Sequence, residues 1–396
     1  MHRPSIALPV FLALLAAAAP ARAAAQQAAD SAALVTVLGA DTLALERWVR
    51  AGDRVTADVV VRSPRTTLRR YLLELGPDGA MRRFEERTFD PAAPERGPLR
   101  TERLERQGDG WARTVVEGDS TASGTVAGPA EALPFVDLVH WPFELVLARP
   151  RGAAADAEEE APLLAGGRVL PFRVRRFGAD SVALTHPLRG TTTARVDARG
   201  RLLSLDAGRT TRKVRVTRTP WPALEERARA WAAADAAGRG IGELSGRGRA
   251  EAVVAGARIA VDYGTPMKRG REIFGAVVPW GQVWRTGANR ATHFSTDRAL
   301  VLGDPATGTL AVPPGEYTLF SIPAPDGGLL IVNRQTGQNG TAYDVAQDLG
   351  RVRMRIGKLP DVVERFTVEV EEEARGGGAL HLRWDRTQFT VPFAVQ

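Results

Sequence analysis

The chain of 396 residues contains no cysteine. This absence excludes disulfide bonds, a thiolate nucleophile, cysteine-ligated metal sites and a lipid anchor on an N-terminal cysteine. Histidine is also scarce, with five in the whole chain, and no two of them stand at the spacing of a metal-binding motif. We therefore expect neither a metal site nor a cofactor, and the stability of the fold has to come from its packed core.

Lysine is even rarer than histidine. Lys213, Lys268 and Lys358 are the only lysines, so the net charge of +7 rests on arginines that are spread over every segment. No cluster of these arginines forms a basic helix or a known nucleic-acid-binding motif. The charge therefore does not indicate specific nucleic-acid binding, although such a protein would adhere to an anionic envelope polymer.

Long apolar runs are missing too. The longest extends from Ile6 to Ala19, which is short of the roughly 20 residues that a membrane-spanning helix needs. It follows Met-His-Arg and is itself followed by small residues up to Ala25, the order found in a secretory signal peptide. We expect residues 1–25 to be such a peptide, and the protein to be exported to the periplasm or the extracellular space, with no transmembrane segment.

The next part of the chain, residues 30–222, consists of short runs in which apolar and polar residues alternate between turn residues. This pattern is typical of antiparallel strands with one solvent-facing side. The clearest hairpins pair residues 68–75 with 81–89 and residues 191–196 with 202–205. We predict an antiparallel β-sheet domain.

Two segments interrupt this pattern. Residues 133–147 are strongly apolar, and two interpretations remain open: a core helix or lid packed on the sheet, or the lining of an apolar cavity. His140 within them is expected to be a hydrogen-bonded core histidine. Residues 149–167 contain Asp156 and three consecutive glutamates, and we expect a solvated loop rather than a metal site.

Residues 223–237 are rich in strong helix formers, and the glycines of residues 238–242 end the run. We predict a helix and glycine-rich linker at residues 223–244, followed by a second, independently folding domain at residues 245–396. Its predicted strands cover residues 250–261, 300–302, 315–322, 329–332, 351–356, 364–370, 380–384 and 388–393. This spacing predicts a β-sandwich or jelly-roll-like fold, so the whole chain should be mainly β.

Polar, aromatic and glycine residues crowd together between Gly270 and His293 without a repeat that would explain them. The glycines permit positive φ angles, and the larger side chains supply stacking and hydrogen-bonding groups. We take this block as the candidate ligand-binding site. Its candidate residues, with the two basic residues at or before its start, are Lys268, Arg271, Trp280, Trp284, Arg285, Asn289 and His293.

Two interpretations of Arg285 remain open. Its planar guanidinium, flanked by Trp284, could bind a carboxylate, phosphate or sugar-like ligand, with Trp280 as a second wall. Alternatively, it could be buried against Asp262 or Asp348, while Asn289 caps backbone groups.

Residues 293–297 favour a structural role over a catalytic arrangement. His293, Ser295 and Asp297 would share one face of a strand, but no nucleophile is fixed beside them. The chain also lacks a Gly-x-Ser-x-Gly turn, a phosphate-binding loop and a His-Glu-x-x-His helix.

The block and the residues that follow it carry a longer series of motifs. These motifs are, in order, Val261–Pro266, Lys268–Arg271, Ile273–Gly275, Val278–Gly281, Val283–Asn289, Pro314–Pro323, Ile331–Asn333, Tyr343–Arg351 and Leu380–Trp384. In this order they resemble the family catalogued as domain of unknown function 2911. The resemblance implies an exported bacterial β-rich domain of unassigned activity. Where members often carry glutamate or tryptophan, this chain has Arg290, Gly328 and Asn339.

Together these observations predict an exported envelope or periplasmic protein of unassigned activity, with a non-catalytic binding or scaffolding role. Its expected partner is a small anionic or saccharide ligand or an envelope polymer. The alternative is an extracytoplasmic hydrolase or transferase that acts on an anionic or sugar-like substrate.

Overall fold

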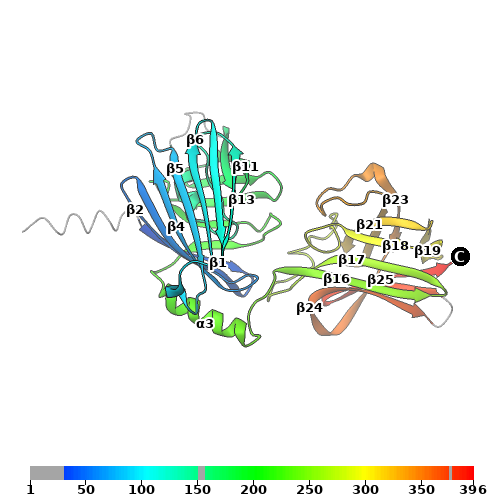
Figure 1. The fold of residues 1–396 in the computed structure, drawn as a ribbon. Helices are drawn as coiled ribbons and strands as arrows, with labels where there is room; N and C mark the ends of the chain where they lie inside the picture. Colours follow the sequence, from blue (N-terminus) through cyan, green and yellow to red (C-terminus); the bar gives the residue numbers. More distant parts are fainter. Residues whose placement is uncertain (1–30, 150–156, 374–376) are drawn as a thin grey trace, which may run out of the picture.

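The computed structural model describes residues 31–149, 157–373 and 377–396, so the predicted signal peptide lies outside the described residues. Figure 1 shows two lobes, a large curved sheet and a smaller pair of sheets. We call residues 31–244 the N-terminal lobe and residues 245–396 the C-terminal lobe. Strands dominate both lobes, which confirms the prediction of a mainly β chain.

One sheet of fifteen strands forms the N-terminal lobe. The chain steps outward from β1 to β8 by antiparallel hairpins, and then returns from β9 to β15, which pairs with β1. All neighbours are antiparallel except β9 and β10. The strands are β1 (Ser31–Leu38), β2 (Asp41–Ala51), β3 (Arg54–Val61), β4 (Thr67–Leu75), β5 (Met81–Phe89), β6 (Arg100–Gln107), β7 (Gly110–Glu117), β8 (Ser120–Ala127), β9 (Leu133–Pro134), β10 (Glu158–Ala165), β11 (Arg168–Arg176), β12 (Ser181–His186), β13 (Gly190–Val196), β14 (Leu202–Asp206) and β15 (Arg215–Arg218).

Helix α2 (Trp141–Ala148) fills the inside of this curved sheet. Its first seven residues are buried, and they join one apolar core with strands from both ends of the sheet. The ends of the sheet approach each other at β8 and β11, so the helix is enclosed. The core-helix interpretation of residues 133–147 is therefore confirmed, with the helix itself starting at Trp141.

Two buried carboxylates hold α2 in place. Glu46 of β2 accepts hydrogen bonds from the backbone N–H groups of His140 (2.8 Å) and Trp141 (3.0 Å), where the helix leaves N–H groups without an internal partner. Its Oε1 also lies 3.1 Å from Nδ1 of His140, which confirms the predicted core histidine. Within the first turn of the helix, Glu144 accepts a hydrogen bond from Arg218 at 2.6 Å, and burial raises the pKa of Glu144.

The prediction of a solvated loop at residues 149–167 is wrong for residues 158–165. These residues form β10, which pairs along its whole length with β11. Leu163 and Leu164 are buried in the core, and Arg173 of β11 donates to Glu158 at 2.8 Å. Opposite charges on neighbouring strands allow a strand to carry several glutamates on its exposed side.

His186, at the end of β12, is buried in a neutral state. Its ring lies edge-on to Phe172, with 4.9 Å between ring centroids, and its Nδ1 accepts a hydrogen bond from the N–H of Leu188 at 3.0 Å. Burial, and then the charges of Arg189 and Arg168, lower its pKa to about 4. In the unfolded chain a histidine binds a proton near pH 6.5.

The stability of the N-terminal lobe is therefore expected to decrease as the pH is lowered from about 6.5 to about 4. In that range only the unfolded chain gains a proton at position 186. His186→Asn keeps a hydrogen-bond acceptor near Leu188 but does not titrate. Melting curves from pH 7.5 to 4 should show a smaller loss of melting temperature for the variant than for the wild type. Two parallel profiles would contradict the assignment.

Helix α3 (Leu224–Ala236) confirms the helix predicted between the lobes. It packs on the sheet rather than spanning free space, since Leu224 and Ala228 share a small apolar cluster with strands β3 and β4. Two single-turn 3-10 helices also occur, Pro94–Arg96 and Val345–Gln347. Among the described residues, no helix is long and apolar enough to cross a membrane.

The C-terminal lobe consists of a six-stranded and a four-stranded sheet that share one apolar core, as predicted for a β-sandwich. The first sheet has the order β16, β17, β18, β21, β22, β23, and the second has the order β20, β19, β25, β24. The strands are β16 (Ser245–Val254), β17 (Ala257–Pro266), β18 (Thr292–Thr296), β19 (Leu300–Asp304), β20 (Gly308–Val312), β21 (Gly315–Ala324), β22 (Gly327–Asn333), β23 (Asp348–Arg353), β24 (Arg355–Glu373) and β25 (Gly377–Val395).

Strand boundaries in this lobe differ from the prediction at several places. Residues 351–356 are divided between β23 and β24, and β24 also includes the segment predicted separately at residues 364–370. Residues 250–261 belong to two strands, because Ala255 and Gly256 form a turn with φ angles of 46° and 81°. The segments predicted separately at residues 380–384 and 388–393 are one long strand, β25. A residue with a positive φ angle reverses the chain only where the strands on its two sides can pair with each other. The sequence alone does not show which strands pair.

The two lobes contact each other at the turn between β1 and β2. The backbone N–H of Ala40 donates to the carbonyl oxygen of Arg269 at 3.0 Å, and the guanidinium of Arg269 pairs with Asp41. A Cβ atom at Gly39 would lie 2.0 Å from the same carbonyl oxygen, and Gly39 has a φ of 61°. The contact therefore requires glycine at this turn.

Candidate functional site

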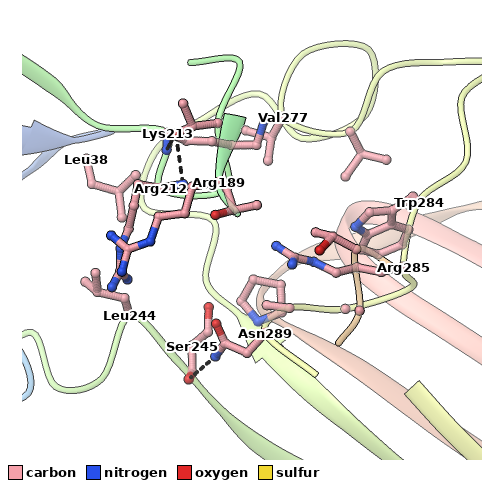
Figure 2. A pocket seen from close by; sticks show the side chains of 18 of the residues that line it. Leu38, Arg189, Arg212, Lys213, Leu244, Ser245, Val277, Trp284, Arg285 and Asn289 are labelled. Atoms are coloured by element: carbon pink, nitrogen blue, oxygen red, sulfur yellow. Dashed lines mark hydrogen bonds between the residues drawn. The ribbon is translucent and has the colours of Figure 1, made fainter. Parts of the chain in front are cut away.

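A cavity of about 710 Å³ lies between the lobes, and Figure 2 shows some of its side chains. The N-terminal lobe contributes loop residues near β9, β13 and β15, and the C-terminal lobe contributes much of the block from residue 271 to residue 289. Six basic side chains and two carboxylates line it: Arg189, Arg209, Arg212, Lys213, Arg271 and Arg285, with Asp137 and Glu243.

Arg285 is half-buried and points into this cavity (Figure 2). Within the described ranges, its guanidinium has neither an ion pair nor a hydrogen bond, and burial lowers its pKa. The alternative interpretation, in which Arg285 is buried against Asp262 or Asp348, is wrong about these partners. Asp262 pairs with Arg249 at 2.6 Å, and Asp348 pairs with Arg351 at 2.8 Å.

Backbone and hydroxyl contacts, rather than the side chain of Arg285, fix this loop. Trp284 and Ser321 of β21 exchange two backbone hydrogen bonds of 2.7 and 2.8 Å, and the hydroxyl of Thr286 donates to that of Ser321 at 2.9 Å. Thr286 is fully buried with a φ of 49°, which is unusual for a β-branched residue. These contacts fix the backbone at Arg285, while its guanidinium has no hydrogen-bond or ion-pair partner in the part of the chain that the structure describes.

The two tryptophans of the block do not form the walls of one slot. The ring of Phe274 contacts both, stacked on Trp280 at 5.7 Å and edge-on to Trp284 at 6.2 Å. Trp284 also stacks on Trp384 at 5.9 Å. Trp284 lines the cavity while Trp280 does not, and the other aromatic residues of the lining are Phe320, Tyr343 and Trp384, which the sequence did not indicate.

The two basic residues at or just before the start of the block, Arg271 and Lys268, have different environments. Lys268 forms an ion pair with Asp385 at 2.7 Å and is not part of the cavity lining. Arg271 lines the cavity, and its guanidinium donates to the backbone carbonyls of Met267 and Lys268 but has no carboxylate partner among the described residues. Burial, and then the charge of Arg269, lower the pKa of Arg271.

Asn289 lies in the cavity lining with a φ of 63°, and its side-chain amide donates to the carbonyl of Ser245 at 3.3 Å. The asparagine therefore also caps a backbone group, as the structural interpretation proposed. His293 lies on β18 outside the cavity lining. Asp297 follows that strand, and its carboxylate accepts the backbone N–H of Arg258 at 2.7 Å, so no hydrogen bond links it to His293.

Sequence reasoning missed the contribution of the N-terminal lobe. Lys213 lines the cavity between β14 and β15, and its ammonium group donates to the carbonyl of Gly208 at 3.1 Å. Burial, and then the charges of Arg271 and Arg285, lower the pKa of Lys213. The sequence held one signal, since Lys213 is one of three lysines in an arginine-rich chain.

The cavity is thus a basic cleft between a curved antiparallel sheet and a β-sandwich. Residues 245–393 match the model of the family described as "Protein of unknown function (DUF2911)", which confirms the resemblance seen in the motifs. No curated protein matches the chain. Two solved structures match about half of it, a DUF1089 family protein from Pseudomonas aeruginosa (14% identity) and a β-barrel-like protein of domain of unknown function DUF1849 from Brucella abortus (10% identity). Each match has a TM-score of 0.32 and covers 48% of this chain and 94% of the other.

Proposed function

We propose that the protein is an exported, non-catalytic binding protein that holds a small ligand in the cavity between its lobes. The observation that carries this proposal is Arg285, a half-buried guanidinium that faces the cavity without a counter-charge among the described residues. A cation taken out of water without a partner is unfavourable, so a ligand with acceptor oxygens stabilises it. Its planar donors suit a carboxylate, a phosphate or the hydroxyls of a sugar.

The cavity lining supports binding rather than catalysis. It offers guanidinium and ammonium groups, an aromatic wall at Trp284, and the amide of Asn289, which are groups that hold and orient a ligand. The alternative, a hydrolase or transferase, needs a base beside a nucleophile. His293, the candidate base, lies outside the lining. Export is supported by the signal-peptide pattern of residues 1–25.

Arg285→Lys tests this function, because it keeps the charge and removes the planar pair of donors. The probes are inorganic phosphate, citrate and glucose, titrated against tryptophan fluorescence and against the melting temperature. We expect at least one probe to bind the wild type and to bind the variant about tenfold more weakly, the effect of losing one charge-assisted hydrogen bond. The probe-free melting temperature should not change, because the side chain of Arg285 has no protein partner to lose among the described residues.

Arg258→Lys is the matched control, since the side chain of Arg258 is 84% exposed and does not line the cavity. It should leave probe binding unchanged. If the wild type binds none of the three probes, or if Arg285→Lys binds them as well as the wild type does, the proposed function is overturned.

A further inference from the structure

We infer that the ligand is a compact oxyanion with at least two negative charges, held jointly by Lys213 of the N-terminal lobe and Arg285 of the C-terminal lobe. This inference rests on the proposed function, because it names the ligand class of the same cavity.

The charges that line the cavity do not balance. The six basic residues and two carboxylates leave an excess of four positive charges. Asp137 is already shared by Arg189, at 2.7 Å, and Arg212, so it is not available to the other cations. A partly buried excess of one sign is unfavourable by itself, and a multivalent anion relieves it more fully than a monovalent or neutral ligand does.

Lys213 and Arg285 face the same space from opposite lobes. Figure 2 shows Lys213 and Arg212 on one side of the cavity and Arg285 on the other. Burial lowers the pKa of Lys213, and the charges of Arg271 and Arg285 lower it further, as expected for cations that line one cavity. Among the described residues, neither has a carboxylate partner that would neutralise it. An anion between them replaces this repulsion with two charge-assisted contacts.

Backbone geometry on both sides of the cavity is also unusual. Seven non-glycine residues with positive φ occur among the described residues, and three of them line the cavity. These are Leu138 (64°), Lys213 (55°) and Asn289 (63°). Such conformations are unfavourable for residues with a Cβ atom, and they cluster at ligand clamps, where they place side chains that ordinary turns would not. The positive φ angle of Lys213 thus places this residue in the cavity lining.

The inference is tested with Lys213→Gln in the full-length mature chain, using inorganic phosphate and citrate as multivalent probes, acetate as a monoanion and glucose as a neutral probe. We expect phosphate or citrate to bind the wild type, and acetate and glucose to bind at least about tenfold more weakly. Lys213→Gln should weaken binding of the multivalent probe about tenfold, because one charge-assisted contact is lost. The probe-free melting temperature should stay the same or rise, since a repelled charge is removed.

Lys358→Gln is the matched control, because it makes the same change at an exposed lysine on β24, away from the cavity. It should bind the probes as the wild type does. A double variant, Lys213→Gln with Arg285→Lys, adds a second readout. If both side chains contact one anion, the double variant should bind more weakly than either single variant, and the two effects should not simply add.

The outcomes separate this inference from the proposed function. If glucose binds as tightly as phosphate, and Lys213→Gln binds like the wild type while Arg285→Lys does not, the oxyanion class is overturned but a binding cavity remains. If Lys358→Gln weakens binding as much as Lys213→Gln, the anion responds to net charge only and the inference is overturned. If no probe responds to Arg285→Lys, the proposed function and this inference fall together.

Discussion

Replacing Glu46 with alanine is expected to lower the free energy of unfolding by about 3 to 5 kcal/mol. The side chain is fully buried and accepts the backbone N–H groups of His140 and Trp141 at the start of α2. Alanine leaves two buried donors without an acceptor, at about 1 to 3 kcal/mol each, and adds a small cavity. Because α2 fills the inside of the sheet, loss of its N-terminal anchor affects the whole core of the lobe.

Chemical denaturation monitored by tryptophan fluorescence gives the change directly. Glu46→Gln should be milder than alanine, because the amide keeps one acceptor oxygen. The matched control is Glu105→Ala on β6, a 52% exposed side chain whose ion pairs are longer than 3.6 Å, and it should change stability by less than about 1 kcal/mol. If Glu46→Ala unfolded at the same denaturant concentration as Glu105→Ala, the anchoring of α2 by this carboxylate would be wrong.

Local patterns in the sequence predict the individual strands better than their arrangement. The hairpin of β4 and β5 follows from alternation around a Gly-Pro-Asp-Gly turn, and the structure pairs these strands as predicted. The pairing of β1 with β15, which joins the two halves of the large sheet, depends on residues about 180 positions apart. Nothing local signals it. The contact between Glu46 and His140 is similarly distant, so the sequence indicates a core histidine but not its partner.

The candidate site shows the same limit. Residues 270–293 stand out because they are irregular, and four of the seven candidates do line the cavity, namely Arg271, Trp284, Arg285 and Asn289. Of the others, Trp280 packs on Phe274, Lys268 pairs with Asp385, and His293 lies on β18 away from the cavity. The sequence does not reveal these environments, because they depend on the positions of other residues in the fold. Lys213 could not be assigned to the site, because its place there depends on how the two lobes meet.

The contact between the lobes leads to the second large expected effect, a loss of about 3 to 5 kcal/mol of unfolding free energy in Asp41→Ala. Only 4% of the side chain of Arg269 is exposed, and Asp41 is its ion-pair partner. Its remaining hydrogen bonds go to the backbone carbonyls of Ile241 and Glu243 and to the sulfur of Met267, none of which carries a full negative charge. Without Asp41 a buried cation is left uncompensated, which is more unfavourable than the absence of both charges.

A double-mutant cycle by chemical denaturation tests this. Arg269→Met replaces the guanidinium with an apolar side chain, so Asp41→Ala combined with Arg269→Met should be clearly more stable than Asp41→Ala alone. The control is Asp78→Ala, which removes a carboxylate from an exposed ion pair with Arg82 and should change stability much less than Asp41→Ala does. An Asp41→Ala variant as stable as Asp78→Ala, or a double variant no better than Asp41→Ala, would show that water already solvates Arg269. In that case the lobes would be joined at this point by the backbone contact of Ala40 and by the hydrogen bonds of Arg269 to the carbonyls of Ile241 and Glu243, rather than by the ion pair.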